Sequence, residues 1–447
     1  MFTSNGLAFV DEGQAAALAN VEVEPRDILL NITGDSVARA CMVPDWCTPA
    51  RVNQHVSIVR PGPDLDPTFL LCFLQSSKPL LLKLASSGAT RNALTKGMIG
   101  DLEIELPNIE TQRAIASLIG QIQQKIVLNQ QTNDYLAELL DVLFVDMLND
   151  ADASWERLSL LDIASYKNGL AMQKFRPAPG DPGLPVLKIK ELGQGVCTPD
   201  SERCASTIDE SVKIHDGNLV FSWSGTLLLD FWAGGDAGLN QHLFKVTSDR
   251  YPSWLYYLWT KHHMDRFIML AKDRATTMGH IKRSALAESE VLIPPVEQLE
   301  VLTRRMQPIV DELVVNKIQS RNLAGLRDVL LPKLMSGEID VSNVRLSMPP
   351  NNHLSLRAIE MSDLNDLLVF EVPALLRKKA ETRSISIHLI DCMLLNLKAS
   401  RYPSNTTPEL QRLVGKKRHF CKSLTHGGLS NLSISHFVHN QTEGFFS

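Results

Sequence analysis

The sequence predicts an α+β protein in which two mixed α/β domains are separated by a pair of long coiled-coil helices. Three observations support this fold class: an internal repeat, an apolar seam with coiled-coil spacing in each copy, and short strand-like runs mixed with helical runs before each seam. The predicted segments are the two domains, 1–107 and 151–294, the first helix, 108–150, the second helix with its end motif, 295–344, and a tail, 345–447.

The first long helix is predicted from Asn108 to Leu148. Its apolar positions recur at alternating spacings of three and four, which is the a/d pattern of a coiled coil. The candidate spacer positions are Ile119, Ile122, Ile126, Asn129, Leu136 and Leu143. A seam of this length requires a partner helix.

The partner is predicted within the same chain, because the seam recurs 187 residues later. The recurring candidate positions are Ile309, Leu313, Asn316, Leu323 and Leu330. Asn129 recurs as Asn316, and a polar residue at such a position sets the register of paired helices. The alternative is that the two Asn side chains leave the seam for solvent. We expect this second helix to end at Pro332.

The repeat extends into the domains. Asn-Gln-His occurs at residues 53–55 and again at 240–242, while the strand-ending Gly34 and Gly225 differ by 191 positions. The second copy starts near Trp155, so the first copy lacks counterparts for about 35 residues of the second. The first domain is therefore predicted to be incomplete at its N-terminal side.

Alternating and continuous apolar runs predict the elements of each domain. In the first domain, strands are expected at 26–33, 52–59 and 102–106, with a helix at 68–84. In the second, strands are expected at 186–189, 218–222, 242–246 and 291–293, with a helix at 252–270.

Composition limits the function classes. The 447 residues are 44% hydrophobic and 21% charged, with no apolar run that could cross a bilayer and no signal peptide, so we expect a cytoplasmic protein. Seven cysteines without a CxxC pair argue against a disulfide framework and a zinc ribbon. The tail carries a net charge of +5 and residues 1–344 carry −10, which argues against a free-standing, tight nucleic-acid binder.

Two segments are basic within this acidic chain. Residues 78–97 and 261–283 each carry a net charge of +4 and occupy related places in the two copies. Local positive charge serves contact with phosphates, although a solvated helix face would have the same composition. The candidate DNA-binding residues are Thr90, Arg91 and Lys96 in the first copy and Lys272, Arg274, Thr276, Thr277, His280, Lys282 and Arg283 in the second.

The repeated triplets Asn53-Gln54-His55 and Asn240-Gln241-His242 are the other candidate DNA-binding residues. Asn and Gln can pair with adenine through two hydrogen bonds, and His can donate to a base or a phosphate. Each triplet also leads into an apolar strand, so its side chains could instead satisfy backbone groups of the domain. The repetition of an identical triplet favours a structural role for at least part of it.

Motifs for catalysis are missing from the sequence. Gly193-Gln194-Gly195 does not continue into a dinucleotide-binding fingerprint, and there is no phosphate-binding GxxxxGK[ST], no NPP[FY] or DPPY tetrad, no GxSxG and no HExxH. The polypeptide is therefore predicted to be non-catalytic, with no catalytic and no metal-binding residues.

Several stretches resemble the specificity (S) subunits of type I restriction–modification systems. TQRAIASLIGQIQQKIVLNQQTNDYLAELLDVLF at 111–144 and LRDVLLPKLMSGEIDV at 326–341 are similar to the conserved helical regions of that family. NGLAMQKFRPAPGDPGLPVLKIKEL, NLVFSWSGTLLLDF, LNQHLFKV and ATTMGHIKR, between residues 168 and 283, are similar to its target-recognition domains. The resemblance covers about residues 20–344 and leaves out the tail.

The resemblance implies two target-recognition domains at opposite ends of an antiparallel helix pair, each recognising half of a bipartite site in double-stranded DNA. About 40 helical residues at about 1.5 Å each give a spacer on the order of 60 Å. The family also implies two docked adenine-N6 methyltransferase (M) subunits and restriction (R) subunits, with S-adenosylmethionine, ATP and Mg²⁺ bound by those partners and no cofactor on this chain.

Two alternatives remain open from the sequence. The incomplete first domain is compatible with a scaffold that docks methyltransferase subunits and recognises only one half-site. The long seam is also compatible with a coiled-coil interaction protein that does not bind DNA.

Overall fold

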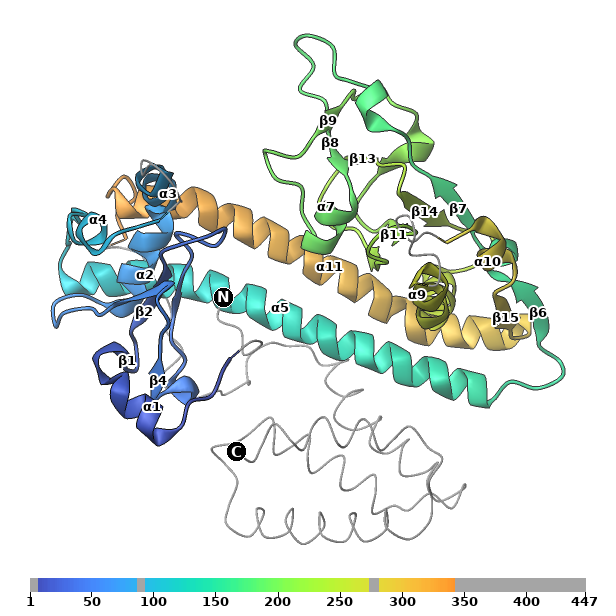
Figure 1. The fold of residues 1–447 in the computed structure, drawn as a ribbon. Coiled ribbons are helices and arrows are strands. Elements are labelled where there is room, and N and C mark those ends of the chain that lie inside the picture. The colour runs from blue at the N-terminus through green and yellow to red at the C-terminus, as the bar shows by residue number, and fades with distance from the viewer. Residues whose placement is uncertain (1–6, 87–92, 273–280, 342–447) are drawn as a thin grey trace, which may run out of the picture. The chain divides into compact units, whose positions relative to one another are not determined.

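The computed structural model describes residues 7–86, 93–272 and 281–341, which form a mixed helix and strand fold (Figure 1). The predicted tail lies outside these residues. Up to the first long helix, the elements are α1 (Glu12–Ala17), η1 (Ala19–Val21), β1 (Glu22–Val23), β2 (Ile28–Asn31), β3 (Ala40–Met42), η2 (Asp45–Cys47), β4 (Ala50–Arg51), β5 (Val56–Val59), α2 (Pro67–Ser76), α3 (Lys78–Ser86) and α4 (Lys96–Gly100).

The remaining elements start with the long helix α5 (Ile109–Asn149) and end with its partner α11 (Val296–Met335). Between them lie β6 (Glu156–Ser159), α6 (Leu160–Ile163), β7 (Ser165–Asn168), η3 (Met172–Lys174), β8 (Leu184–Leu187), α7 (Ile189–Gln194), β9 (Arg203–Cys204), η4 (Glu210–Val212), β10 (Lys213–Ile214), β11 (Leu219–Ser222), β12 (Leu229–Phe231), β13 (Ala237–Leu239), β14 (Leu243–Thr247), α8 (Ser253–His262), α9 (Met264–Lys272), α10 (Arg283–Ala287) and β15 (Glu290–Ile293).

The helices α5 and α11 lie side by side, drawn in cyan and orange in Figure 1. Asn108 starts α5 as its N-cap, with its Oδ1 accepting a hydrogen bond from Thr111 N at 2.9 Å. Side-chain contacts between the helices run in opposite sequence directions: Gln123 bonds Arg327, and Asn133 bonds the Leu313 carbonyl oxygen. The two helices are therefore antiparallel.

The sheets of the two domains share a plan. In the first, β2 pairs antiparallel with β3 and β5, and in the second, β11 pairs antiparallel with β12 and β14. The registers correspond, since Ile28 opposes Val59 and the residues related by the repeat, Leu219 and Val246, oppose each other. The small pair β1–β4 likewise corresponds to β10–β13.

Five strands of the second domain, β6, β7, β8, β9 and β15, have no counterpart strand in the described part of the first. β7 extends the second sheet beside β14, β8 extends the other sheet beside β13, and β6 pairs with β15. In the first domain, β5 and β4 are edge strands. The expected strand at 102–106 is wrong, since these residues do not form a strand. Among the described residues, no strand pairs with them in the way that β6 pairs with β15.

The two domains contact opposite ends of the helix pair. Phe69 and Cys72 of α2 pack with Ile115 of α5 and Leu334 of α11. At the other end, Trp254 Nε1 of α8 donates to Thr303 Oγ1 of α11 at 3.1 Å. Phe144 of α5 meets Trp259 of α8 edge to face, with ring centroids 5.1 Å apart. The buried aromatic side chains of α8 are thus part of the core.

The second domain is also bound to the middle of α11 by ion pairs. Arg321 Nη1 lies 2.7 Å from Asp216 Oδ1 and also donates to the Ala233 carbonyl oxygen at 2.7 Å. Lys317 forms an ion pair with Asp230. The residues related to Lys317 and Arg321 by the repeat are Gln130 and Asp134, so the first domain has no equivalent attachment through cations at these positions.

Two other expectations about helices need correction. The helices expected at 68–84 and 252–270 are each split in two, as α2 with α3 and α8 with α9. The expected end at Pro332 is wrong, since α11 continues to Met335 with Pro308 and Pro332 inside it. Within a long, packed helix, the loss of one hydrogen bond at each Pro is tolerated. Among the described residues, none of the helices is long and apolar enough to span a membrane.

Candidate nucleic-acid interface

The ends of β2 and β11 form the same backbone arrangement in both domains. Ile32 N donates to the His55 carbonyl oxygen at 2.9 Å, and Trp223 N donates to the His242 carbonyl oxygen at 3.4 Å. The chain then turns at Gly34 (φ 74°) and Gly225 (φ 63°), a left-handed conformation that glycine adopts without strain. We call this arrangement the strand-end turn; it comprises residues 32–34 with 53–55 in the first domain and residues 223–225 with 240–242 in the second.

The Asn and His of each repeated triplet stabilise the strand-end turn. Asn53 Oδ1 accepts from His55 N at 3.0 Å, and Asn240 Oδ1 accepts from His242 N at 3.2 Å. Each His Nδ1 shares a hydrogen bond with a hydroxyl group before the turning glycine. The His55–Thr33 pair is 2.7 Å long and the His242–Ser224 pair is 3.0 Å long.

Unlike the Asn and His, the Gln of each triplet makes no hydrogen bond to the turn backbone or to the hydroxyl group before the glycine, and both Gln54 and Gln241 are exposed. Gln54 makes no side-chain hydrogen bond with the described residues, and Gln241 Nε2 lies 3.3 Å from His242 Nε2. The triplet therefore divides into two framework residues and one exposed amide. An exposed amide can offer both a donor and an acceptor to a base edge.

The two basic segments return to the sheet at the strand-end turn. After residues 87–92, Leu94 N donates to the Ile32 carbonyl oxygen at 2.8 Å. After residues 273–280, Ile281 N donates to the Trp223 carbonyl oxygen at 2.9 Å. Six candidates, Thr90, Arg91, Arg274, Thr276, Thr277 and His280, lie outside the described residues.

The described basic candidates divide by their contacts. Lys96, Lys272 and Lys282 are exposed and make no side-chain hydrogen bond or ion pair with the described residues. Arg283 is also exposed, but its Nη1 donates to the Tyr166 carbonyl oxygen of β7 at 3.3 Å. Arg283 is therefore engaged within the domain, while its counterpart in the repeat, Lys96, is not.

Part of the positive charge of residues 261–283 is neutralised within the fold. Lys261 Nζ lies 2.6 Å from Asp141 Oδ1 of α5, and Arg266 Nη2 lies 3.3 Å from Glu288 Oε2. Composition alone could not separate these two cations from Lys272 and Lys282, because it contains no information on partners distant in sequence.

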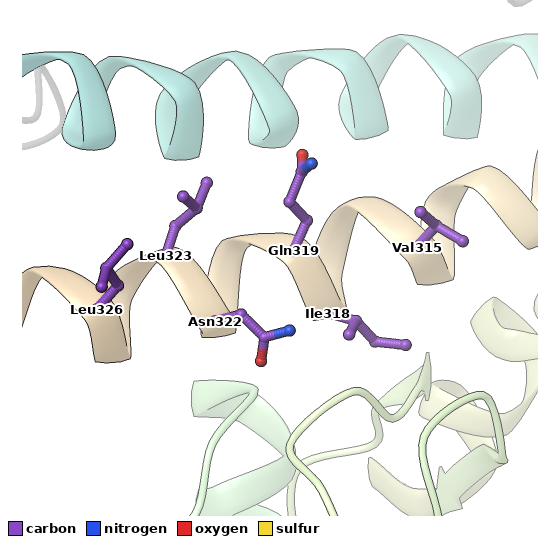
Figure 2. Close-up of a pocket in the computed structure, with 6 residues that line it drawn as sticks. All are labelled: Val315, Ile318, Gln319, Asn322, Leu323 and Leu326. Carbon is purple, nitrogen blue, oxygen red and sulfur yellow. The ribbon is translucent and has the colours of Figure 1, made fainter.

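Most candidate spacer positions are buried between the long helices. The buried ones are Ile119, Ile122, Asn129, Leu136, Leu143, Ile309, Leu313 and Asn316. Ile126, Leu323 and Leu330 are only partly buried. Leu323 lines a pocket of about 350 Å³ on α11, together with Val315, Ile318, Gln319, Asn322 and Leu326 (Figure 2). The seam is therefore more open beside this pocket.

The two seam asparagines do not leave for solvent, so that alternative is wrong. Asn129 Nδ2 donates to Gln319 Oε1 at 2.8 Å and lies 3.3 Å from the Asn316 carbonyl oxygen. Asn316 Nδ2 donates to Asn133 Oδ1 at 3.0 Å, and Asn133 Nδ2 in turn donates to the Leu313 carbonyl oxygen at 3.1 Å. These residues, with Asn316 and Ser320, form the polar layer of the helix pair.

Sequence reasoning missed the two hydroxyl groups of the strand-end turn. Thr33 and Ser224 directly precede the turning glycines, and they align at the same offset of 191 as those glycines. Aligning the copies at this offset as well as at 187 would have identified both residues. Among the described residues, no group of three or more His, Cys, Asp or Glu side chains could hold a metal ion.

Comparison with known proteins places this geometry in context. Residues 26–138 match the family model described as the type I restriction modification DNA specificity domain. The specificity subunit of the type I restriction enzyme MjaIX from Methanocaldococcus jannaschii is 24% identical over 293 residues, which is 59% of this chain and 66% of that protein. The EcoBI specificity subunit from Escherichia coli is 20% identical over 215 residues, 46% of this chain and 44% of that protein.

These alignments thus span less than two thirds of the length of both relatives. Among solved structures, the type I restriction–modification S subunit from M. genitalium is 18% identical, with a TM-score of 0.42, covering 70% of this chain and 84% of that one. The family and curated matches confirm that the chain resembles the specificity subunits of type I restriction–modification systems, with the match to their DNA specificity domain at residues 26–138.

Proposed function

We propose that this chain is the non-catalytic DNA-recognition subunit of a type I restriction–modification complex and recognises a bipartite site. The observation that carries the proposal is the strand-end turn, which occurs in both domains with the same hydrogen bonds and lies next to a basic segment in each. Two copies of one recognition frame, held at opposite ends of a helix pair, suit two half-sites on one duplex.

The helix pair acts as the spacer of this proposal. α5 has 41 residues and α11 has 40, so each is on the order of 60 Å long, a little under two turns of B-DNA. Side chains buried between the helices fix their relative position, and the domains then lie a set distance apart. The candidate DNA-binding residues named above remain part of this proposal.

Methyltransferase subunits are proposed to dock on the exposed apolar residues of the helix pair. Val142 of α5 is 57% exposed, and Val329 of α11, which is its counterpart in the repeat, is 61% exposed. Exposed apolar residues at equivalent positions of both helices suit two copies of one partner. S-adenosylmethionine, ATP and Mg²⁺ are then bound by the methyltransferase and restriction subunits.

A second function is favoured by the missing counterparts of β6, β7 and β8 in the described first domain. A domain with open sheet edges is less rigid, and it could dock partners while the second domain alone recognises DNA. The chain would then select a single half-site.

The test is selection from a randomised DNA duplex library by this chain bound to a methyltransferase subunit. A motif with two conserved halves at fixed spacing supports the proposed function, and a single conserved half supports the second function. If the complex shifts no duplex even at low salt, the chain is a helical interaction protein and the proposal is wrong.

A further inference from the structure

We infer that Asp35 and Thr226, at equivalent tips of the two strand-end turns, contact bases and help to determine the two half-sites. The inference rests on the proposed function and adds residues that determine specificity. Both residues follow the turning glycine directly, and both are related by the offset of 191. Both side chains are exposed and make no hydrogen bond with the described residues.

The tip is held rigidly in the first domain. Val37 N donates to the Gly34 carbonyl oxygen at 3.1 Å and closes the turn around Asp35. Asn31, the last residue of β2, donates from Nδ2 to Ser36 Oγ at 2.9 Å. The backbone at Asp35 is therefore fixed on both sides.

The tip of the second domain is held from the same position of the sheet. Ser222 is the counterpart of Asn31, and its hydroxyl donates to the Thr226 carbonyl oxygen at 2.8 Å. Ser222 N also donates to the Leu228 carbonyl oxygen at 2.7 Å. Different side chains at one position thus fix the same tip, and fixed geometry is what base recognition needs.

The chemistry of the two tips differs although their frame is the same. Gln54 and Gln241 are identical, so they cannot by themselves distinguish two half-sites. Asp35 and Thr226 differ in charge and in hydrogen-bonding groups. Among the exposed side chains compared at the strand-end turn, only those at the tip, Asp35 and Thr226, differ between the two domains.

A carboxylate at the tip favours one type of contact. Phosphates repel Asp35, so it does not serve as a backbone contact, whereas a carboxylate accepts a hydrogen bond from the N4 amino group of cytosine. Thr226 has a hydroxyl group and a methyl group, which suits either a base edge or the methyl group of thymine. The structural alternative, that Asp35 only forms the turn, would use its side chain in a hydrogen bond to the turn backbone. No such bond is found among the described residues.

The test compares variants in the randomised-duplex selection, with the methyltransferase subunit bound. Asp35→Asn should lower discrimination at one base position by on the order of ten-fold, in one half-site only. Thr226→Ala should change the other half-site only, and the exchanges Asp35→Thr and Thr226→Asp should alter base choice at the same two positions. Each unaffected half-site is the internal control.

The matched control is Glu12→Gln, which removes an exposed negative charge from α1 and should leave both half-sites unchanged. Thermal midpoints of all variants should equal that of the unmodified chain, because the substituted side chains are exposed. If the unmodified chain selects a bipartite motif and the variants select the same motif, the inference is overturned while the proposed function stands. If the unmodified chain selects no motif, both are wrong. If only Thr226→Ala alters a half-site and Asp35→Asn alters none, the role of Asp35 is overturned.

Discussion

Asn316 Nδ2 of α11 donates a hydrogen bond to Asn133 Oδ1 of α5 at 3.0 Å, across the interface of the long helices. Asn129 bonds the same part of α11 from the preceding turn of α5. This polar layer lies near the middle of both helices. Burying polar groups is favourable only when they are paired, so the layer disfavours any other register of the seam.

The first prediction concerns this layer. Asn316→Ala should destabilise the chain by about 1–3 kcal/mol, because Asn133 Oδ1 loses its donor in a buried place. The measurement is the urea midpoint at neutral pH. Asn322→Ala is the matched control, since Asn322 is exposed on the same helix, and it should change stability by less than about 0.5 kcal/mol. Equal effects of the two substitutions would show that the layer is not a stabilising feature.

The second prediction concerns a buried carboxylate of the first domain. Burial tends to raise the pKa of Asp27, but hydrogen bonds from Arg60 and from Glu24 N lower it below its ordinary value of 3.8. Arg60 Nε and Nη2 each lie 2.8 Å from this carboxylate. A lowered folded pKa gives stability that is present above pH 3.8 and lost as the pH falls through the folded pKa.

Asp27→Asn should therefore lower the midpoint of unfolding at pH 7, and the difference from the unmodified chain should shrink at acid pH. The measurement is a denaturation series from neutral to acid pH. A difference that is independent of pH would contradict an ionic role for Asp27.

The third prediction concerns His215 in the second domain. Hydrogen bonds from its ring nitrogens to Asp236, at 2.7 Å, and to Glu210, at 2.6 Å, raise the pKa of His215 above 6.5. A raised folded pKa gives stability that is fully present below pH 6.5 and lost as the pH rises through the folded value. His215→Gln should reduce stability below this range and have little effect above it. An NMR titration of the ring protons measures the pKa directly, and a value at or below 6.5 would contradict the prediction.

The fourth prediction separates two neighbouring cations. Lys282→Ala should weaken DNA binding and reduce the slope of log affinity against log salt by about one, because one phosphate contact is lost. Arg283→Ala should in addition lower the thermal midpoint, since Arg283 also donates to the Tyr166 carbonyl oxygen. Binding measured over a salt series, beside thermal unfolding, tests both. An unchanged slope for Lys282→Ala would remove Lys282 from the interface.

The sequence predicted those parts of the fold that depend on local periodicity. The seam of α5 and the second copy of that seam were visible because buried positions recur every three or four residues. The strand expected at 102–106 failed for a non-local reason: its apolar alternation matches β15, but a strand needs a paired neighbour, and the partner of β15 is β6. The apolar alternation of a segment does not indicate whether a neighbouring strand is available to pair with it.

The candidate residues could be selected from the sequence, but the contacts that assign a role to each of them could not. Each triplet was expected to lead into an apolar strand, and β5 and β14 do follow, but the bonds of His55 to Thr33 and of His242 to Ser224 join residues 22 and 18 positions apart. These contacts show that the Asn and His of each triplet stabilise the turn, while the Gln does not. Likewise, Arg283 could not be distinguished from Lys282 before its bond to the β7 backbone was known.

The edge strand β5 has a consequence for the order in which the chain loses its structure. In the second domain, β7 covers the corresponding edge of β14 with hydrogen bonds along four residue pairs. Along the outer edge of β5, the described residues provide no such paired strand. Amide hydrogens there should exchange with solvent sooner than those of β14, and the two domains, although built on one plan, should open one after the other on warming.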